Sequence, residues 1–491
     1  MLPHVQLDPD SGVPLYRQLC TYIKEYIASG KLSRGERLPA TRTLAGLLGL
    51  NRTTVSAAYA LLEAEGLLQG HVGRGSFVLG ELGQPRPPGL NWEQILPPPE
   101  PGAPHSSLPP DAISFATSRP AGELFPLDAF RLCCDEVLAG PDAATVLQLG
   151  SPAGYAPLRH HLLDHARREG VARSSDDLII TSGCQQALDL LQRILVRPGD
   201  AVLLEDPVYP GLKNLFANGG AQLVGIPAGI DGIDIEALER AALRTRPRLI
   251  VTTPNFQNPT GGTLPVEGRR AVLRIARNAG AILVENDIYG ELRYTGEPLP
   301  PVKQMDDAGD TVLLRSFSKL TFPGLRVGWI IAPKALVTRV ASAKQLADLH
   351  TDQLSQAALL RFAESGRLAA HRQRVLAAGA ARLRAVLEAC AASLPAGSSF
   401  TRPQGGMSLW ARLPEPLDSA ELLPRAHQEN VSYLPGRYFE VSRRDPGALR
   451  LSFAGLEPEK IRAGLAVLGR VFSSELARTR FERFEPAPAV V

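Results

Sequence analysis

The chain is 491 residues long, and its apolar share of 44% and charged share of 21% are those of an ordinary globular protein with roughly two or three domains. A net charge of +3 spread over this length does not indicate a nucleic-acid partner, so any basic surface must be local. The sequence shows neither a secretion signal nor an apolar run long enough to cross a membrane, and its five scattered cysteines have neither metal-ligand spacing nor a disulfide framework. These features favour a cytoplasmic protein.

The first segment predicts three short helices followed by a hairpin. Apolar residues recur at helical spacing over residues 15–27, Gly49 can end a second helix, and Asn51 can cap a third over about residues 52–65. Two short helices joined by a tight glycine-containing turn form a helix-turn-helix. The stretch LLQGHVGRGSFVLG then alternates like a hairpin with Arg74 at its tip, which suits a DNA minor groove.

Helices of this kind also occur in small domains that bind no DNA. Here, however, the stretches GERLPATRTLA, NRTTVSAAYALLEAEGL and GRGSFV resemble the winged helix-turn-helix of the GntR family of transcription regulators, over residues 12–80. The resemblance implies contacts to double-stranded DNA from Arg37, Arg42, Arg52, Thr53, Thr54 and Arg74.

Residues 81–112 are rich in proline, with ten prolines and no sustained apolar period. Such a segment cannot build a core and behaves as a semi-rigid spacer. A proline-rich ligand for a partner domain is the alternative. We therefore expect a linker between residues 12–80 and a long second domain over residues 113–475, with residues 476–491 as a tail.

In the long part, apolar runs alternate with helical patterns. The runs are DLIITSG, DAVLLEDP, PRLIVTTPN, GAILVEND and DTVLLRSFS. This alternation predicts a mainly parallel α/β sheet covered by helices on both faces.

The stretch SFSKLTFPGLRVGW places Lys319 among small hydroxyls, seven residues before Arg326. A lysine amine forms a Schiff base with a carbonyl, and the best-known resident carbonyl is that of pyridoxal 5′-phosphate. This cofactor also needs a phosphate cradle at a helix N-terminus, an arginine, a flat partner for its ring and a donor to its phenolic oxygen. A lone lysine is most often a solvated surface group, so the other parts must be present.

Those parts follow successive apolar runs, where parallel strands collect ligand groups at their carboxyl ends. A serine, a glycine and a cysteine open a helical pattern and can cradle the phosphate, one tyrosine can lie on the ring, and an asparagine can donate to the phenolic oxygen. Each alone is more often a loop residue or a helix cap; together they predict a cofactor site. The residues are Ser182, Gly183, Cys184, Tyr209, Asn258, Tyr289, Ser316, Ser318 and Arg326, with Lys319 as the Schiff-base lysine.

These motifs, NPTGG and SFSK…GLRVGW above all, resemble those of class I/II aminotransferases of fold type I in their residues and in their order. The resemblance covers about residues 113–470. The resemblance implies a large α/β cofactor domain, a smaller α+β C-terminal part from the mid-300s, and a carboxylate-binding role for Arg450. The whole chain resembles the MocR/GabR-type regulators. That likeness implies a domain-swapped homodimer that uses the aminotransferase fold to sense ligands.

The sequence departs from the aminotransferase pattern at two places. In those enzymes a carboxylate three residues before the tyrosine binds the pyridine nitrogen, but here Asn286 stands three residues before Tyr289, with Asp287 next to it. A neutral amide cannot enforce the ring charge that transamination needs. Either Asp287 takes that place, or Asn286 faces the ring and catalytic power falls; we favour the second, because a one-residue slip turns a strand side chain to the other face. Leu149 also replaces a tyrosine that reaches the neighbouring subunit's phosphate.

Three functions remain open from the sequence. The first is a regulator that binds pyridoxal phosphate and senses an amino acid, an amine such as a γ-amino acid, or the cofactor itself. The second is an active aminotransferase with an accessory DNA-binding domain, against which Asn286 counts. The third is a DNA-binding protein whose second domain is a dimerisation scaffold, which the intact Lys319, Arg326 and Asn258 disfavour.

Overall fold

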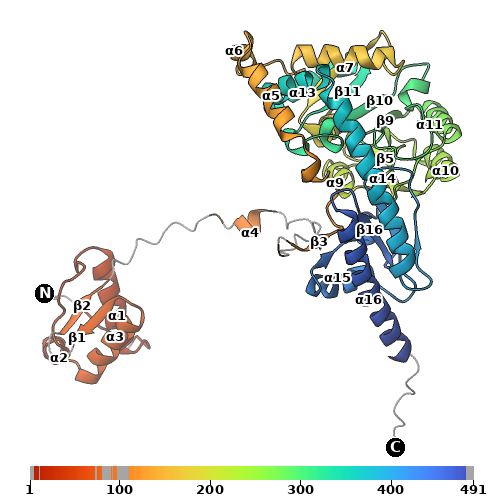
Figure 1. Ribbon diagram of the computed structural model, residues 1–491. Coiled ribbons are helices and arrows are strands. Elements are labelled where there is room, and N and C mark those ends of the chain that lie inside the picture. The colour runs from red at the N-terminus through yellow and green to blue at the C-terminus, as the bar shows by residue number, and fades with distance from the viewer. Residues whose placement is uncertain are drawn as a thin grey trace, which may run out of the picture. The chain divides into compact units, whose positions relative to one another are not determined.

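The computed structural model describes residues 5–9, 11–71, 75–79, 90, 92–96, 109 and 111–482. The chain divides into two compact units, Met1–Pro101 and Gly102–Val491 (Figure 1). Each unit is taken by itself below.

The N-terminal unit contains the expected three helices and hairpin. They are α1 Leu15–Ala28, α2 Thr41–Leu48, α3 Arg52–Ala64, β1 Leu68–His71 and β2 Gly75–Val78. Gly49 ends α2 in the left-handed conformation, and the Asn51 side chain accepts a hydrogen bond from the Thr53 amide at the start of α3. One apolar core, with Leu19, Val55 and others fully buried, joins the helices to the hairpin. The fold is that of a winged helix-turn-helix.

Within the proline-rich segment the structure describes one short helix, α4 Trp92–Ile95. Trp92, Ile95 and Leu96 are all exposed, so this turn of helix is not part of a core.

The second unit is built on an eight-stranded sheet in the order β4-β11-β10-β9-β8-β5-β6-β7. The five neighbours from β10 through β6 run parallel, whereas β11 is antiparallel to both β10 and β4. The strands are β4 Asp176–Thr181, β5 Ala201–Asp206, β6 Gln222–Gly229, β7 Gly232–Ile233, β8 Leu249–Thr252, β9 Ile282–Asn286, β10 Val312–Ser316 and β11 Gly328–Pro333.

Helices cover both faces of this sheet, because successive residues of its strands enter different cores. Ile179 of β4 packs with α8, whereas its neighbours Leu178 and Ile180 pack with α7. The helices are α5 Leu127–Leu138, α6 Ala143–Val146, α7 Ala156–Arg168, α8 Gly183–Leu195, α9 Pro210–Asn218, α10 Ile235–Thr245, α11 Val266–Ala279, α12 Lys334–Asp348 and α13 Gln353–Glu364, with 3-10 turns η1 Gly122–Leu124, η2 Lys303–Met305, η3 Phe317–Lys319 and η4 Pro323–Leu325.

A smaller α+β part follows the large sheet. Its four strands lie in the order β12-β13-β16-β15, and the long helix α14 runs from the large sheet into this part (Figure 1). The elements are α14 Arg367–Ser393, β12 Ser399–Phe400, β13 Ser408–Arg412, α15 Ser419–Gln428, β14 Val431–Ser432, β15 Leu434–Pro435, η5 Gly436–Tyr438, β16 Ala448–Ser452 and α16 Pro458–Glu482.

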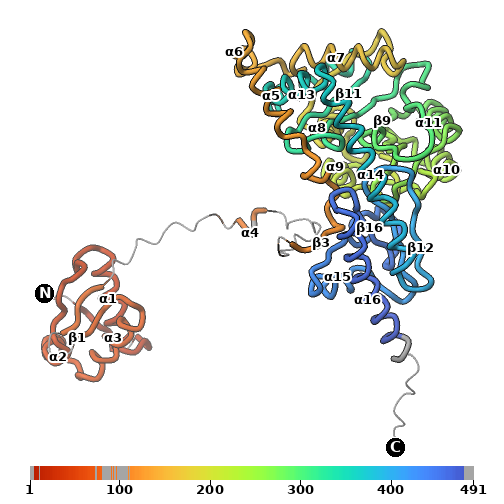
Figure 2. The backbone as a smooth tube through the Cα atoms, in the orientation of Figure 1, coloured from red at the N-terminus to blue at the C-terminus, as the bar shows by residue number. Residues whose placement is uncertain are grey.

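The smaller part also includes the start of the second unit, which the sequence did not predict. Strand β3, Ile113–Ser114, pairs with β14, and the fully buried Phe115 enters the same core as α16. The backbone trace shows β3 beside β16 (Figure 2), and the Ser452 amide donates to the Phe115 carbonyl. We call residues 113–119 the strap, since they run from this core toward the large sheet.

The expected tail over residues 476–491 is wrong at its start, because α16 continues to Glu482. Leu476 is buried in the core of the smaller part, and Glu475 accepts hydrogen bonds from Arg425 and Arg478. Burial and ion pairing therefore hold this turn of helix in place. None of the helices in the described ranges is long and apolar enough to span a membrane.

Candidate functional site

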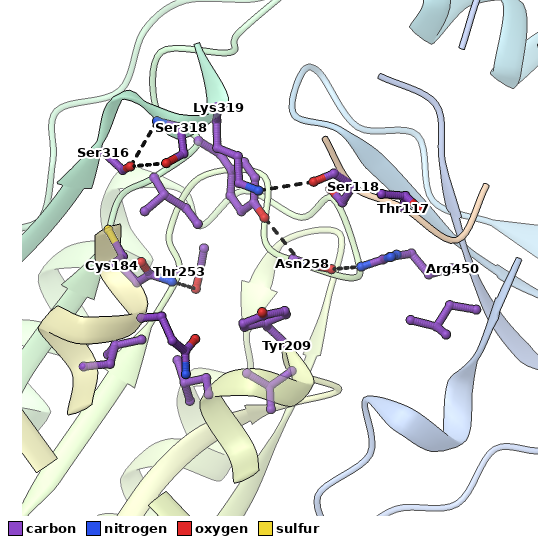
Figure 3. Close-up of a pocket in the computed structure, with 18 of the residues that line it drawn as sticks. Thr117, Ser118, Cys184, Tyr209, Thr253, Asn258, Ser316, Ser318, Lys319 and Arg450 are labelled. Atoms are coloured by element: carbon purple, nitrogen blue, oxygen red, sulfur yellow. Dashed lines mark hydrogen bonds between the residues drawn. The ribbon is translucent and has the colours of Figure 1, made fainter. Parts of the chain in front are cut away.

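A cavity of about 560 Å³ opens at the carboxyl ends of the parallel strands (Figure 3). Asn286 and Ser316 end β9 and β10, Thr253 follows β8, Tyr209 follows β5, and Cys184 follows β4. Side chains from successive strands therefore meet at one edge of the sheet, as in other open α/β folds. The smaller part contributes the opposite wall.

Lys319 lies in this cavity at the end of the turn η3. The Ser316 hydroxyl caps that turn by accepting from the Ser318 amide at 3.0 Å. The Lys319 amine donates to the Ser118 carbonyl at 3.2 Å and lies 5.7 Å from the centre of the Tyr289 ring. Burial lowers the pKa of Lys319, with Arg450 and Arg326 acting in the same direction. A larger share of the amine is then neutral and nucleophilic.

Gly183 and Arg326 form an anion cradle at the N-terminus of α8. Gly183 has a φ of +78°, and a Cβ there would lie 2.3 Å from the Arg326 guanidinium. Arg326 itself has a φ of +55°, a conformation rare for arginine, and donates to the Ser182 carbonyl. A residue with a Cβ would displace this guanidinium and would be strained at the φ of Gly183. A helix N-terminus faced by an arginine suits a phosphate group.

Ser182 and Cys184 stand on either side of Gly183 and contact groups outside the cradle. The Ser182 hydroxyl lies 3.2 Å from the hydroxyl of Thr351, which stands just before α13. The Cys184 thiol donates to the Arg315 carbonyl at 3.3 Å, and burial raises its pKa to about 12. Cys184 is therefore a protonated thiol and no nucleophile.

Asn258 joins two further predicted residues. Its amide nitrogen donates to the Tyr289 phenol at 3.4 Å, and its amide oxygen accepts from Arg450 at 3.1 Å. Burial raises the pKa of Tyr289, so the phenol stays protonated and can itself donate. Tyr209 stands just before α9 and lines the same cavity with 44% of its surface exposed.

Arg450 comes from β16 of the smaller part and is 4% exposed. Its guanidinium donates to Asn258 and to the Ala116 carbonyl and lies 5.0 Å from the centre of the Phe439 ring, while its Nε has no partner in the described part of the chain. Burial lowers its pKa to about 10. No carboxylate among the described residues pairs with this buried cation, so its surroundings suit a carboxylate ligand.

Asn286 and Asp287 face different surroundings. Asn286 lines the cavity; its amide nitrogen is 3.5 Å from the Thr253 hydroxyl, and its buried amide oxygen has no partner among the described residues. Asp287 does not line the cavity, since its carboxylate accepts from Asn255 at 2.8 Å and pairs with Arg315 at 3.1 Å. The group that the strand end offers to the cavity is therefore an amide.

These residues fit pyridoxal 5′-phosphate. The cradle around Gly183 would hold its phosphate, Lys319 would bind its carbonyl carbon, and Asn258 and Tyr289 would serve its phenolic oxygen. The amide oxygen of Asn286, which has no partner among the described residues, would accept from a ring-nitrogen donor.

The sequence missed the strap. Ala116 and Ser118 contribute backbone carbonyls to Arg450 and Lys319, and the Ser118 hydroxyl lies near Tyr289 without a hydrogen bond of normal geometry to a described group. Every residue has a backbone carbonyl, so a pattern of side chains does not indicate which carbonyls face a site. The hint that the sequence offers is the polar Thr117-Ser118 pair, which follows Phe115 and Ala116.

The predicted DNA-contacting residues lie on one helix-turn-helix unit. Arg42 is exposed on α2, Arg52 and Thr53 are exposed at the start of α3, and Thr54 is half-buried. Arg37 is exposed, and its guanidinium lies against Gly75 of the hairpin. Arg74 lies outside the described residues.

Comparisons with known proteins cover both units. Residues 133–468 match the family described as aminotransferase class I and II, and residues 15–78 match that of bacterial regulatory proteins, gntR family. The probable rhizopine catabolism regulatory protein MocR of Rhizobium meliloti is 31% identical over 95% of each chain. Aromatic-amino-acid aminotransferase 1 of Thermococcus litoralis is 36% identical over 75% of this chain and 89% of its own. The crystal structure of LysN, an α-aminoadipate aminotransferase of Thermus thermophilus, has a TM-score of 0.71 at 36% identity and covers 75% of this chain and 93% of its own.

Proposed function

Since the chain belongs to the MocR-type family, in which a GntR helix-turn-helix domain is joined to an aminotransferase class I and II domain, we propose that it regulates transcription in response to an amino compound bound beside pyridoxal phosphate. The winged helix-turn-helix binds the operator through Arg42, Arg52, Thr53 and neighbouring residues. Lys319 holds the cofactor, and Arg450 binds the carboxylate of the effector. We expect this binding to the operator to take place in the cytoplasm.

The observation that best supports this proposal is the position of Asn286 at the end of β9. The cofactor supplies an electron-withdrawing ring, and transamination depends on a protonated pyridine nitrogen. The Asn286 amide bears no charge that would stabilise that proton, and Asp287 is occupied by Arg315. The site therefore retains the groups that bind a cofactor and an amino ligand, while the group that enforces ring charge is missing. Binding without efficient turnover suits a sensor.

An active aminotransferase is the second candidate. Lys319, Arg326, Asn258 and Arg450 all line the cavity, as a working enzyme of this fold would require. The aminotransferase and the regulator make opposite predictions about keto acid release.

We further propose that the protein works as a homodimer with exchanged DNA-binding domains. Exposed leucines gather on α5 and the loop after α6, where Leu127, Leu132, Leu147 and Leu149 are each at least 46% exposed. A second copy would cover these side chains. Leu149 stands where the resemblance implies contact with the neighbouring cofactor phosphate.

The test records the visible absorption of the full-length protein and its affinity for duplex DNA from upstream of its own gene. The cofactor should give an absorption band that Lys319→Ala abolishes. A panel of amino acids and amines should contain a compound that shifts the band and changes DNA affinity without releasing keto acid.

Two results would contradict the proposal. Keto acid release with repeated turnover, without any effect on DNA binding, would favour the aminotransferase. If added pyridoxal phosphate gave no band, the second domain would be a scaffold.

A further inference from the structure

The charged side chains that line the cavity, among the described residues, are all cations. They are Lys319, Arg326 and Arg450, and the rest of the lining in that part of the chain is uncharged. This set is what the described part of one chain offers to a charged ligand, and a charge buried without a partner is unfavourable.

Two of the three cations are engaged by the cofactor. Arg326 lies against Gly183 at the N-terminus of α8, where the phosphate belongs, and Lys319 bonds the cofactor carbon. When the effector amine replaces Lys319 on that carbon, the freed lysine amine stays beside the carbon, so neither cation is placed to pair with the far end of a second ligand. Arg450 alone remains.

Arg450 matches one carboxylate. Its guanidinium has a fixed fork geometry, and its partners in the described chain are an amide oxygen, a carbonyl and an aromatic ring. One carboxylate can pair with it in a bidentate manner. A second carboxylate on the same ligand would find no further cation, and a second ammonium would find no carboxylate among the described lining residues.

The wall around Arg450 is also uncharged. Leu434 lies directly opposite Arg450 in the β15–β16 register, and Thr117 of the strap lies on the same side of the cavity as Arg450 (Figure 3). Ser114 and Ala116 of the strap also line the cavity. Val208, just after β5, and Leu212 of α9 line the cavity as well. This surface accommodates aliphatic or hydroxylated groups.

We propose that the effector is an amino acid with one amine, one carboxylate and an otherwise uncharged body. This inference rests on the proposed function, because it concerns the ligand that Arg450 and the cofactor bind together. Dicarboxylic amino acids, diamino acids and amines without a carboxylate are poor ligands.

A set of compounds with matched carbon chains tests this charge rule. Norleucine, 2-aminoadipate and lysine each have six carbons and differ in the terminal group, and pentylamine is norleucine without its carboxylate. Each is titrated into the full-length cofactor-bound protein, with the band shift and calorimetric heat as readouts. Norleucine should bind at least about tenfold more tightly than the other three, a difference of roughly 1.4 kcal/mol or more.

A second cation should relax the rule. Thr117 is exposed, lines the cavity and belongs to the strap beside Arg450. Thr117→Arg should raise the ratio of 2-aminoadipate affinity to norleucine affinity by roughly two- to fivefold, the size expected of an exposed ion pair. Thr117→Gln has similar bulk without charge and is the matched control.

The outcomes separate this inference from the proposed function. If 2-aminoadipate or lysine bound the natural protein as tightly as norleucine, the charge rule would be wrong and an amino-acid sensor would stand. Equal binding of pentylamine would remove Arg450 as the carboxylate receptor. If no amino compound shifted the band of a protein that holds its cofactor, both the rule and the effector role would fail.

Discussion

Asn258 connects the two ligand-facing parts of the site through a single amide. Its nitrogen donates to Tyr289 of the large part, and its oxygen accepts from Arg450 of the smaller part. A carboxylate that pairs with Arg450 therefore acts on a group that also contacts the phenol beside the cofactor. We therefore expect Asn258 to link effector binding at Arg450 to the cofactor ring.

Asn286→Asp should restore a charged partner for the pyridine nitrogen. The native amide oxygen is buried without a described partner, so a carboxylate of nearly the same shape fits with little repacking. A hydrogen bond to a charged group contributes about 1.5–3 kcal/mol, so single-turnover keto acid release should rise roughly 10–100-fold. Stopped-flow absorbance and keto acid assays measure this rise.

Asn286→Ala is the control for that experiment, because it removes the amide and adds no charge. It should give no gain in keto acid release. A carboxylate variant with native turnover and an unchanged absorption band would mean that residue 286 does not set the state of the ring.

The sequence predicted the side-chain contributors to the site, since these follow successive apolar runs and parallel strands bring their ends together. All the predicted cofactor residues except Asp287 and Gly183 are among those that line the cavity or lie against its cradle, and Gly183 forms the cradle itself. Their roles toward the cofactor and the effector stay predictions. The sequence could not supply the partners of Asp287, because Arg315 and Asn255 reach it only in three dimensions.

At the scale of elements, the strap connects the smaller part to both cations of the site. Phe115 anchors it in the core, and the carbonyls of Ala116 and Ser118 accept from Arg450 and Lys319. The chain leads directly from the linker into β3, so the strap joins the linker to the two cations of the site.

Phe115→Ala should both destabilise the smaller part and weaken ligand binding. Removing this fully buried ring leaves a cavity that costs about 3–5 kcal/mol in the free energy of unfolding. Without its anchor the strap no longer holds its carbonyls beside Arg450 and Lys319, so the dissociation constant of the effector should rise. Denaturant titration and calorimetry measure the two effects.

Phe472→Ala is a matched control on α16. Phe472 is equally buried in the same core but is not part of the strap. It should lose similar stability while leaving the dissociation constant within about threefold. An equal loss of affinity in both variants would attribute the effect to the core and not to the strap.

Among the elements, the long parallel strands were predictable and β3 was not. Strands β4, β5, β8, β9 and β10 each contain a strong apolar run bounded by turn residues. In contrast, β3 is two residues long, and its partner β14 lies more than 300 residues later. Pairings of this kind depend on tertiary packing, which local patterns do not encode.

At the scale of the whole molecule, DNA binding and cofactor binding belong to separate compact units. Arg52→Ala should therefore weaken DNA binding without changing the cofactor band. If Arg52 contacts a phosphate, the slope of log affinity against log salt should fall by about one. Fluorescence anisotropy over a salt series measures that slope.

Arg244→Ala is the control, since Arg244 is exposed on α10 of the second unit. It should leave DNA affinity unchanged. A loss of the cofactor band in the Arg52 variant would contradict the independence of the two units.

The pairing of β3 with β14 has a consequence for how the protein is made. Domains fold as they emerge at about 5–20 residues per second, so the winged helix-turn-helix can fold early during synthesis. Residues 113–115 must then wait roughly 15–60 s for residues 431–432 to appear. During that interval the nascent chain has a complete DNA-binding domain, while Phe115 lacks its core and the ligand site lacks its strap. The second unit is therefore finished last, and until then its exposed apolar strands are most open to chaperones.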